Sequence, residues 1–211
     1  MGQAEFENQL LNLHRCIIDR ETKFMGGDVY WIKDENGQPV GSSKKGVIRD
    51  SDNKEIAKVK KKTFALSPAY LIHDSRGNTV GVMKKKRLSL QATYTVESPG
   101  GDLIASIKAG SGGYQFHAPD GKTTLASFVW ETMGKDEAAE ETSKEGGLRA
   151  FGKKMATAAK AAFRGQRVLQ FQSEQLRPLL ALSSAIGLME MEKEEERQRD
   201  AGGDWDDGDG D

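Results

Sequence analysis

A twenty-residue pattern that occurs twice constrains the fold more than any other feature of this chain. The segments "VIRDSDNKEIAKVKKKTFAL" (residues 47–66) and "LIHDSRGNTVGVMKKKRLSL" (residues 71–90) align without a gap. In each copy an Asp is followed three residues later by Asn or Gly, which tolerate the positive φ of a tight turn. Short apolar runs flank both turns. Each copy therefore predicts a β-hairpin that ends in three consecutive lysines.

The same pattern of apolar residues around a Gly-containing turn recurs, with fewer matching positions, in three other segments, "WIKDENGQPVG", "VESPGGDLIA" and "FHAPDGKTTLA". Together these patterns predict five hairpins between residues 30 and 130. Short strands at this spacing are typical of an all-β sandwich or barrel. The unequal spacing of the turns argues against the strictly stacked repeats of a solenoid or propeller.

Helical patterns replace strand patterns in the C-terminal third. Residues 148–167 carry apolar residues at helical spacing, with basic residues around them and no acid, which predicts a basic amphipathic helix. A second helix, predicted over residues 174–193, is apolar on nearly every face, and Pro178 suits its first turn. Its apolar stretch is shorter than the ~20 residues that span a bilayer. A short helix that is apolar all round must be surrounded by protein.

These patterns predict one domain with two flanking segments. Residues 1–12 form a lead-in and residues 13–193 form the barrel domain, within which residues 131–147 form an acidic loop. Residues 194–211 form an acidic tail that is expected to be disordered. The chain has a net charge of −1, but its charge is segregated, and the acidic tail could fold back and screen the basic surface.

Repeated hairpins followed by one hydrophobic helix resemble the tubby C-terminal-like superfamily, which includes the tubby, phospholipid scramblase and LURP-one-related families. The similarity lies in the motif D-x-x-G-x-x-[VI]-[GA]-x-[VM]-K-K-K at Asp50–Lys62, with Asn53 in the Gly position, and at Asp74–Lys86. The motif pattern is most similar to that of LURP-one-related proteins, and "KKKRLSL" at residues 84–90 is the best single match. The resemblance implies a closed antiparallel barrel of about twelve strands around the C-terminal helix.

The sequence departs from these families in ways that limit what is carried over. It lacks the acidic calcium-binding segment of the scramblase kind and a cysteine cluster for palmitoylation, so scramblase activity is not expected. The phosphoinositide-binding residues of tubby proteins have no one-to-one match here, so no site is transferred. What remains is the expectation of a non-enzymatic module that binds anionic phospholipid, phosphoinositides included.

Composition and motifs exclude several other classes. The single cysteine, Cys16, rules out a disulfide framework, and no apolar signal segment is present near the N-terminus. We expect a cytoplasmic monomer without a transmembrane span, which associates with membranes peripherally. His14, His73 and His117 are scattered without ligand-spaced acids, so neither a metal site nor a cofactor is expected. No catalytic residues are identified, and the chain is not expected to be an enzyme.

The lysine blocks are the first candidate site. Because side chains alternate along a strand, a run of three lysines cannot lie wholly inside a barrel, and it is expected at a rim. Near anionic lipid each Lys or Arg contributes ~1 kcal/mol of binding. The candidate lipid-binding residues are Lys60, Lys61, Lys62, Lys84, Lys85, Lys86 and Arg87. The alternative is a solvated rim whose charges only prevent edge pairing.

The basic amphipathic helix is the second candidate, as a surface for membrane or protein partners. Its candidate residues are Phe151, Lys153, Lys154, Met155, Lys160, Phe163 and Arg164. The alternative is a helix packed on the outside of the barrel. If this helix or the acidic tail binds proteins, the chain would be a soluble interaction or regulatory protein instead. Nucleic acid is disfavoured because no stacking aromatics are interleaved with the basic blocks.

Overall fold

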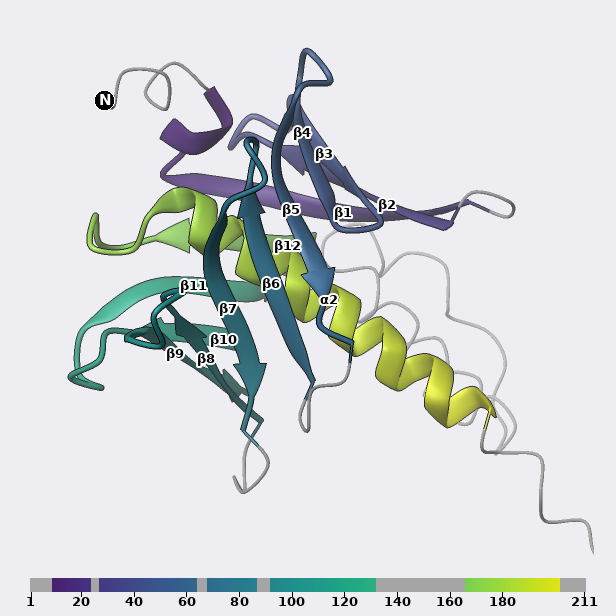
Figure 1. Cartoon of the computed structure of the whole chain (residues 1–211). Coiled ribbons are helices and arrows are strands. Elements are labelled where there is room, and N and C mark those ends of the chain that lie inside the picture. Colours follow the sequence, from purple (N-terminus) through teal and green to yellow (C-terminus); the bar gives the residue numbers. More distant parts are fainter. Residues whose placement is uncertain (1–8, 24–26, 64–67, 87–91, 132–165, 202–211) are drawn as a thin grey trace, which may run out of the picture.

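Twelve strands close into one antiparallel barrel (Figure 1). The computed structural model describes residues 9–23, 27–63, 68–86, 92–131 and 166–201. Neighbours in sequence are neighbours in the sheet, and the first strand pairs with the last. The strands are β1 (Arg15–Lys23), β2 (Gly27–Lys33), β3 (Pro39–Lys44), β4 (Val47–Asp50), β5 (Glu55–Lys61), β6 (Ala69–Asp74), β7 (Thr79–Lys85), β8 (Thr93–Glu97), β9 (Leu103–Gly110), β10 (Gly113–His117), β11 (Thr124–Glu131) and β12 (Gln166–Phe171). The predicted closed barrel of about twelve strands is confirmed.

The five predicted hairpins are confirmed, and they share one turn geometry. In each, the carbonyl oxygen of the first turn residue accepts from the N–H three residues later, and that later residue has a positive φ. The positive-φ residues are Gly37, Asn53, Gly77, Gly101 and Gly121. The carboxylates of Asp34, Asp50 and Asp74 also accept from the N–H groups two and four residues on. Asp therefore fixes the turn locally, as its preference for these positions predicts.

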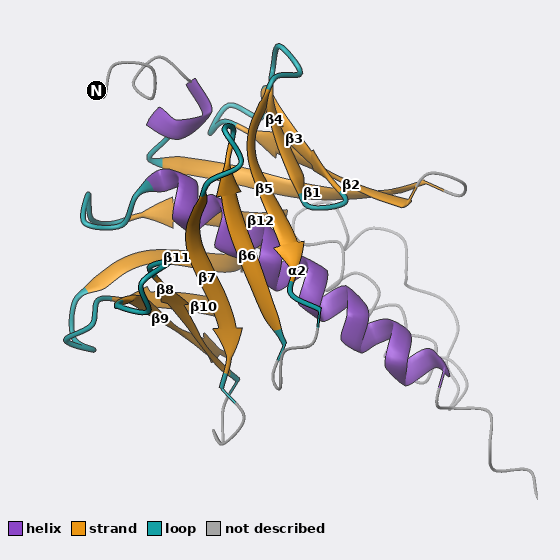
Figure 2. Cartoon of the chain, in the orientation of Figure 1, coloured by secondary structure: helices purple, strands orange, loops and turns teal. Residues whose placement is uncertain are grey.

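One helix, α2 (Pro178–Ala201), fills the barrel (Figure 2). Every residue from Leu179 to Met189 is buried, so no face of this part of the helix meets solvent. Inward-facing side chains such as Ile72 and Met83 belong to the same core cluster as the helix. The prediction that this helix is surrounded by protein is confirmed. Burial of each large apolar side chain contributes about 1.5–3 kcal/mol.

The helix begins and ends later than the sequence predicts. It starts at Pro178 rather than at residue 174, because proline is tolerated only in the first turn. It continues through residues 194–201, where the sequence predicts a disordered tail. No Gly or Pro interrupts the chain between Leu188 and Ala201, and its Glu, Lys and Arg residues are good helix formers. The rest of the predicted tail, residues 202–211, lies outside the described residues.

The predicted basic helix is corrected at its C-terminal end. Gln166 and Arg167 belong to strand β12 and are not helical, because they pair with β11 and β12 is needed to close the barrel. Residues 148–165 and 132–147 lie outside the described residues. At the N-terminus, four residues of the predicted lead-in form a 3₁₀ helix, η1 (Gln9–Asn12), whose Leu10 is buried in the core. The domain therefore extends beyond the predicted limits at both ends.

The two ends of the barrel differ. At one end, here called the turn rim, lie the five hairpin turns, and α2 begins there after β12. At the other end, the exit rim, β5 and β7 end in the two lysine blocks. The charged C-terminal part of α2 leaves the barrel through the exit rim, where it contacts both blocks.

Candidate functional site: the exit rim and its lysines

Strand alternation splits each lysine block. Lys60 is exposed on the outward face of β5, whereas Lys61 points inward and pairs with Glu194 of α2. Strand β7 repeats this arrangement, with Lys84 outward and Lys85 inward. The blocks therefore lie at a rim, as predicted, but their lysines do not all face the same way.

The outward lysines gather on one surface, here called the lysine face, which consists of Lys60, Lys62, Lys84, Lys86 and Lys108. The backbone N–H of Lys62 donates to the carbonyl oxygen of Ala69 at the start of β6, and Ala69 is in turn the cross-strand partner of Lys84 on β7. Likewise, the backbone N–H of Lys86 donates to the carbonyl oxygen of Thr93 on β8, and Thr93 is the cross-strand partner of Lys108 on β9. Because neighbouring strands lie about 4.8 Å apart, the face extends over roughly 20 Å from β5 to β9.

Most of the charge on the lysine face is not neutralised locally. Lys84 pairs with Glu97 of β8. The other four lysines are exposed, and none forms an ion pair with an acid in the described part of the chain. A cluster of exposed lysines without acidic partners creates a positive potential that attracts anionic surfaces.

Inward-pointing bases form a collar around the C-terminal part of α2. Four ion pairs make it: Lys61–Glu194 at 2.7 Å, Lys85–Glu195, Arg20–Glu196 at 3.3 Å and Arg167–Glu192 at 2.6 Å. Their burial is graded. The side chains of Arg167 and Glu192 are 11% and 22% exposed, whereas those of Lys61 and Glu194 are 52% and 36% exposed. The outer pairs are therefore screened by solvent and salt far more than the inner pair.

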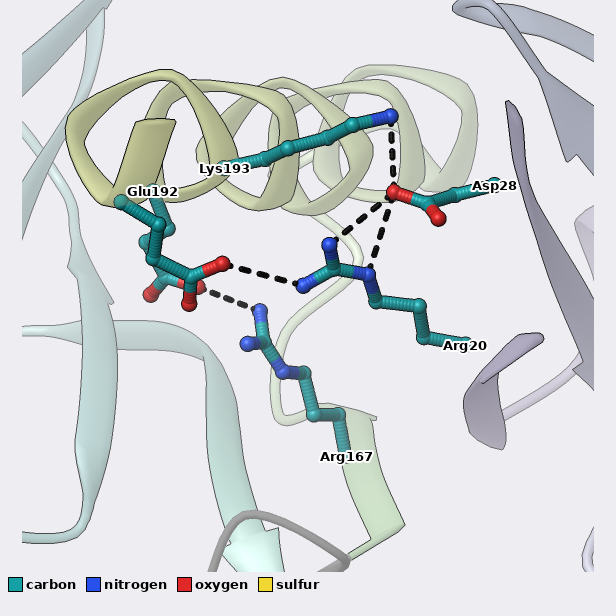
Figure 3. A network of polar contacts seen from close by, with 6 residues as sticks. Arg20, Asp28, Arg167, Glu192 and Lys193 are labelled. Atoms are coloured by element: carbon teal, nitrogen blue, oxygen red, sulfur yellow. Dashed lines mark hydrogen bonds and ion pairs between the residues drawn. The ribbon is translucent and has the colours of Figure 1, made fainter. Parts of the chain in front are cut away.

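Asp28 binds the collar residue Arg20 and is more buried than the glutamates of the four pairs. Its side chain is 4% exposed, and its carboxylate accepts from Arg20 at 3.0 Å and from Lys193 at 2.7 Å (Figure 3). Burial alone would raise the pKa of Asp28, but these two cations outweigh burial and lower the pKa below its usual value. Arg20 also contacts Glu196. The network thereby joins β1, β2 and α2.

Three of the four tyrosines of the chain are the cross-strand partners of collar residues: Tyr30 of Arg20, Tyr70 of Lys61 and Tyr94 of Lys85. Tyr30, Tyr70 and Tyr94 are buried, and Tyr94 packs edge-on against Tyr114 with ring centroids 6.0 Å apart. The Tyr114 hydroxyl donates to Glu192 at 2.8 Å. Burial, and then the negative charge of nearby glutamates, raises the pKa of Tyr30, Tyr70 and Tyr114. The rings thus mark the boundary between the apolar core and the charged exit, a position that suits an apolar ring with one polar end.

A pocket of about 330 Å³ opens at the exit rim between α2 and the ends of β2 to β6. Its charged lining consists of Lys45, Lys61, Lys193, Arg197, Asp28, Glu190 and Glu194. Because Asp28 and Glu194 already pair with lysines, the lining holds little excess charge. Its chemistry therefore selects no particular ligand.

Several candidate residues lie outside the described part of the chain. They are Arg87 of the second lysine block and Phe151, Lys153, Lys154, Met155, Lys160, Phe163 and Arg164 of the basic helix. Conversely, sequence reasoning missed Lys108, which joins the lysine face only through the β8–β9 register. It also missed the roles of Arg20 and Asp28, which lie outside the turn motifs, and it assigned Arg167 to the predicted basic helix.

The described residues carry no sign of other chemistry. Within them, no three His, Cys, Asp or Glu side chains are placed to hold a metal ion. Cys16 is buried, and burial, only partly offset by Arg15, raises the pKa of its thiol to about 12. Such a thiol stays protonated and unreactive near neutral pH. Of the helices in the described ranges, none has the length and hydrophobicity to cross a membrane.

A comparison with protein-family models finds no match to this chain, and a comparison with curated proteins finds none either.

Proposed function

We propose that this chain is a non-enzymatic module that binds the surface of anionic phospholipid membranes, phosphoinositide-containing ones included, through the lysine face. The observation that carries the proposal is the convergence of outward lysines from β5, β7 and β9 on one exposed surface. With ~1 kcal/mol from each lysine near anionic lipid, such a face gives reversible binding. We place the module in the cytoplasm, peripheral to membranes.

The architecture supports this proposal from a second direction. A closed barrel of twelve antiparallel strands around a C-terminal helix is what a resemblance to the tubby C-terminal-like superfamily implies. The motif that carries the resemblance also supplies four of the five lysines of the lysine face, so the fold and most of the candidate surface come from the same repeated segment. We propose that the chain is related to the LURP-one-related branch of that superfamily.

The orientation of the lysine face favours docking of the barrel on its side. The acidic end of α2 projects beyond the strands at the exit rim (Figure 1), so an end-on approach would bring glutamates toward the anionic surface. The outward faces of β5 to β9 carry the lysine face, and the neighbouring acid Glu97 is paired with Lys84. Side-on docking therefore brings the unpaired lysines near the lipid headgroups and keeps the glutamates away.

Liposome co-sedimentation tests the proposal. Vesicles of phosphatidylcholine, with and without phosphatidylserine or phosphoinositide, are mixed with wild type and with the variant Lys60→Glu, Lys62→Glu, Lys86→Glu. The control variant, Lys54→Glu, Arg76→Glu, Lys122→Glu, makes the same charge change at exposed positions of the turn rim.

We expect wild type to bind only anionic vesicles and to lose binding as salt rises. Loss of three lysines should weaken binding by about 100-fold or more, since each contributes ~1 kcal/mol, while the control should retain most of it. Equal losses in the two variants would show that net charge alone matters and would contradict a specific face. No binding by folded wild type would remove the lipid proposal and direct attention to protein partners.

A further inference from the structure

The central lysines of the two repeated blocks hold neighbouring residues of α2. Lys61 donates to Glu194 at 2.7 Å, and Lys85 donates to Glu195. Lys61 and Lys85 occupy equivalent positions in the two copies of the motif, and both point inward because of strand alternation. The repeated block thus has two parts, with outer lysines on the surface and a middle lysine bound to an acidic helix end more than 100 residues away in sequence.

These two contacts differ from the deeper part of the collar. Lys85 and Glu195 are 30% and 47% exposed, and Lys61 and Glu194 are exposed to a similar degree. The pairs at Asp28 and Arg167 lie deeper, with Lys193 12% exposed and Glu192 22% exposed. Solvent competes strongly for the exposed pairs and weakly for the buried ones. The deep pairs can therefore hold α2 in the barrel while the two outer pairs open.

Adjacent glutamates on a helix present carboxylates much as an anionic surface presents phosphates or carboxylates to lysines. Because Glu194 and Glu195 are tethered to the same chain, their effective concentration at Lys61 and Lys85 is high without any gain in intrinsic affinity. An external anionic surface must outcompete them to recruit the two middle lysines.

We propose that Glu194 and Glu195 form an autoinhibitory contact: they occupy Lys61 and Lys85 and lower the affinity of the chain for anionic membranes. This inference rests on the proposed lipid-binding function. Lys61 and Lys85 are the last residues of β5 and β7. When a membrane engages the neighbouring lysine face, their long side chains turn over the rim to its headgroups, and the end of α2 is released from the exit rim.

The first experiment measures binding to phosphatidylcholine vesicles that contain phosphatidylserine. It compares the full chain with Glu194→Gln, Glu195→Gln and with the control Glu35→Gln, Glu174→Gln, which makes the same charge change at exposed positions near the turn rim. We expect the first variant to bind several-fold more tightly than the control, and this gain to vanish when Lys61→Gln and Lys85→Gln are added. Equal binding by the first variant and the control would overturn the proposal.

The second experiment needs no membrane and separates the two proposals. Amide hydrogen exchange is followed along α2 in wild type and in Lys61→Gln, Lys85→Gln. Release of the contact should speed exchange in residues 194–201 and leave residues 179–189 protected. Unchanged exchange in residues 194–201 would overturn the contact itself. If exchange changes as expected but no version of the chain binds vesicles, the lipid function fails, and autoinhibition of it fails too, while the contact stands as a structural clamp.

Discussion

The guanidinium group of Arg167 lies 3.7 Å from the centre of the Trp130 ring. The two residues are cross-strand partners on β12 and β11, next to the strand pair that closes the barrel. The same guanidinium pairs with Glu192 of α2 at 2.6 Å. One side chain therefore connects barrel closure to the position of the internal helix.

Replacing Arg167 with Met should destabilise the fold substantially. The change leaves the shielded carboxylate of Glu192 with the Tyr114 hydroxyl but without its cation. Removing one partner of a buried ion pair typically costs about 3 kcal/mol or more. Urea denaturation followed by circular dichroism measures the free energy of unfolding. Arg167→Lys should recover part of the loss, because Lys keeps the charge but lacks the planar group that stacks on Trp130. A Met variant as stable as wild type would contradict this role.

The turn between β3 and β4 should be far less tolerant of alanine than the hairpin turns. Gly46 has φ +76°, and a Cβ there would lie 2.2 Å from the carbonyl oxygen of Val59. Gly37 has a similar φ of +79°, but a Cβ there meets nothing within 4 Å. Gly37→Ala should cost about 1–2 kcal/mol from backbone conformation alone.

Gly46→Ala should cost roughly 1–3 kcal/mol more than Gly37→Ala, because the Val59 N–H to Gly46 hydrogen bond at 2.7 Å must be disturbed as well. Thermal unfolding of the two variants side by side gives the comparison. Equal melting temperatures would show that β5 shifts without loss of stability. The close approach of Gly46 to the Val59 carbonyl oxygen would then not constrain the residue at position 46.

Glu190 should reduce stability at neutral pH. Burial raises the pKa of its carboxyl above 4.5, even though Lys193 acts in the opposite direction. Below pH 4.5 the group is protonated in both the folded and the unfolded chain, so it has no effect on stability. As the pH rises through the folded-state pKa, folding must keep a half-buried carboxylate ionised, and this costs free energy.

Glu190→Gln should therefore be more stable than wild type at about pH 7, and the difference should disappear as the pH falls through about 4. Urea denaturation at both pH values measures the difference in the free energy of unfolding, with the exposed Glu35→Gln as control. A variant that is less stable than wild type at neutral pH would instead show that the carboxylate makes a stabilising contact.

Much of the fold could be predicted because its determinants are local. In three of the five hairpin turns, an Asp that accepts from the N–H groups two and four residues on, followed by Gly or Asn with positive φ, fixes the turn within five residues. The twelfth strand could not be found this way. Its residues, including Arg167 and Leu169, become a strand through pairing with β1 and β11, and that information lies far away in sequence.

The sequence could predict that the lysine blocks lie at a rim of the barrel. It could not predict fully which lysines point inward to α2 and which point outward to the lysine face. The alternation of apolar Ala57 and Val59 with Lys58 and Lys60 could have shown that Lys61 points inward. The partner of Lys61 could not be inferred, because acidic residues near a chain end carry no signal of where the helix places them. The lysine face likewise needed the register of β7, β8 and β9 before Lys108 could be assigned to it.

The position of α2 after the last strand has a consequence for biosynthesis. While the ribosome still holds the C-terminal segment, the strands emerge with inward-facing residues such as Ile72 and Ile107 and no helix to cover them. The β1–β12 pair joins residues about 150 apart, so closure has a high contact order and is slow. The nascent barrel is therefore expected to need a chaperone, or a delay in collapse, until α2 emerges to fill it.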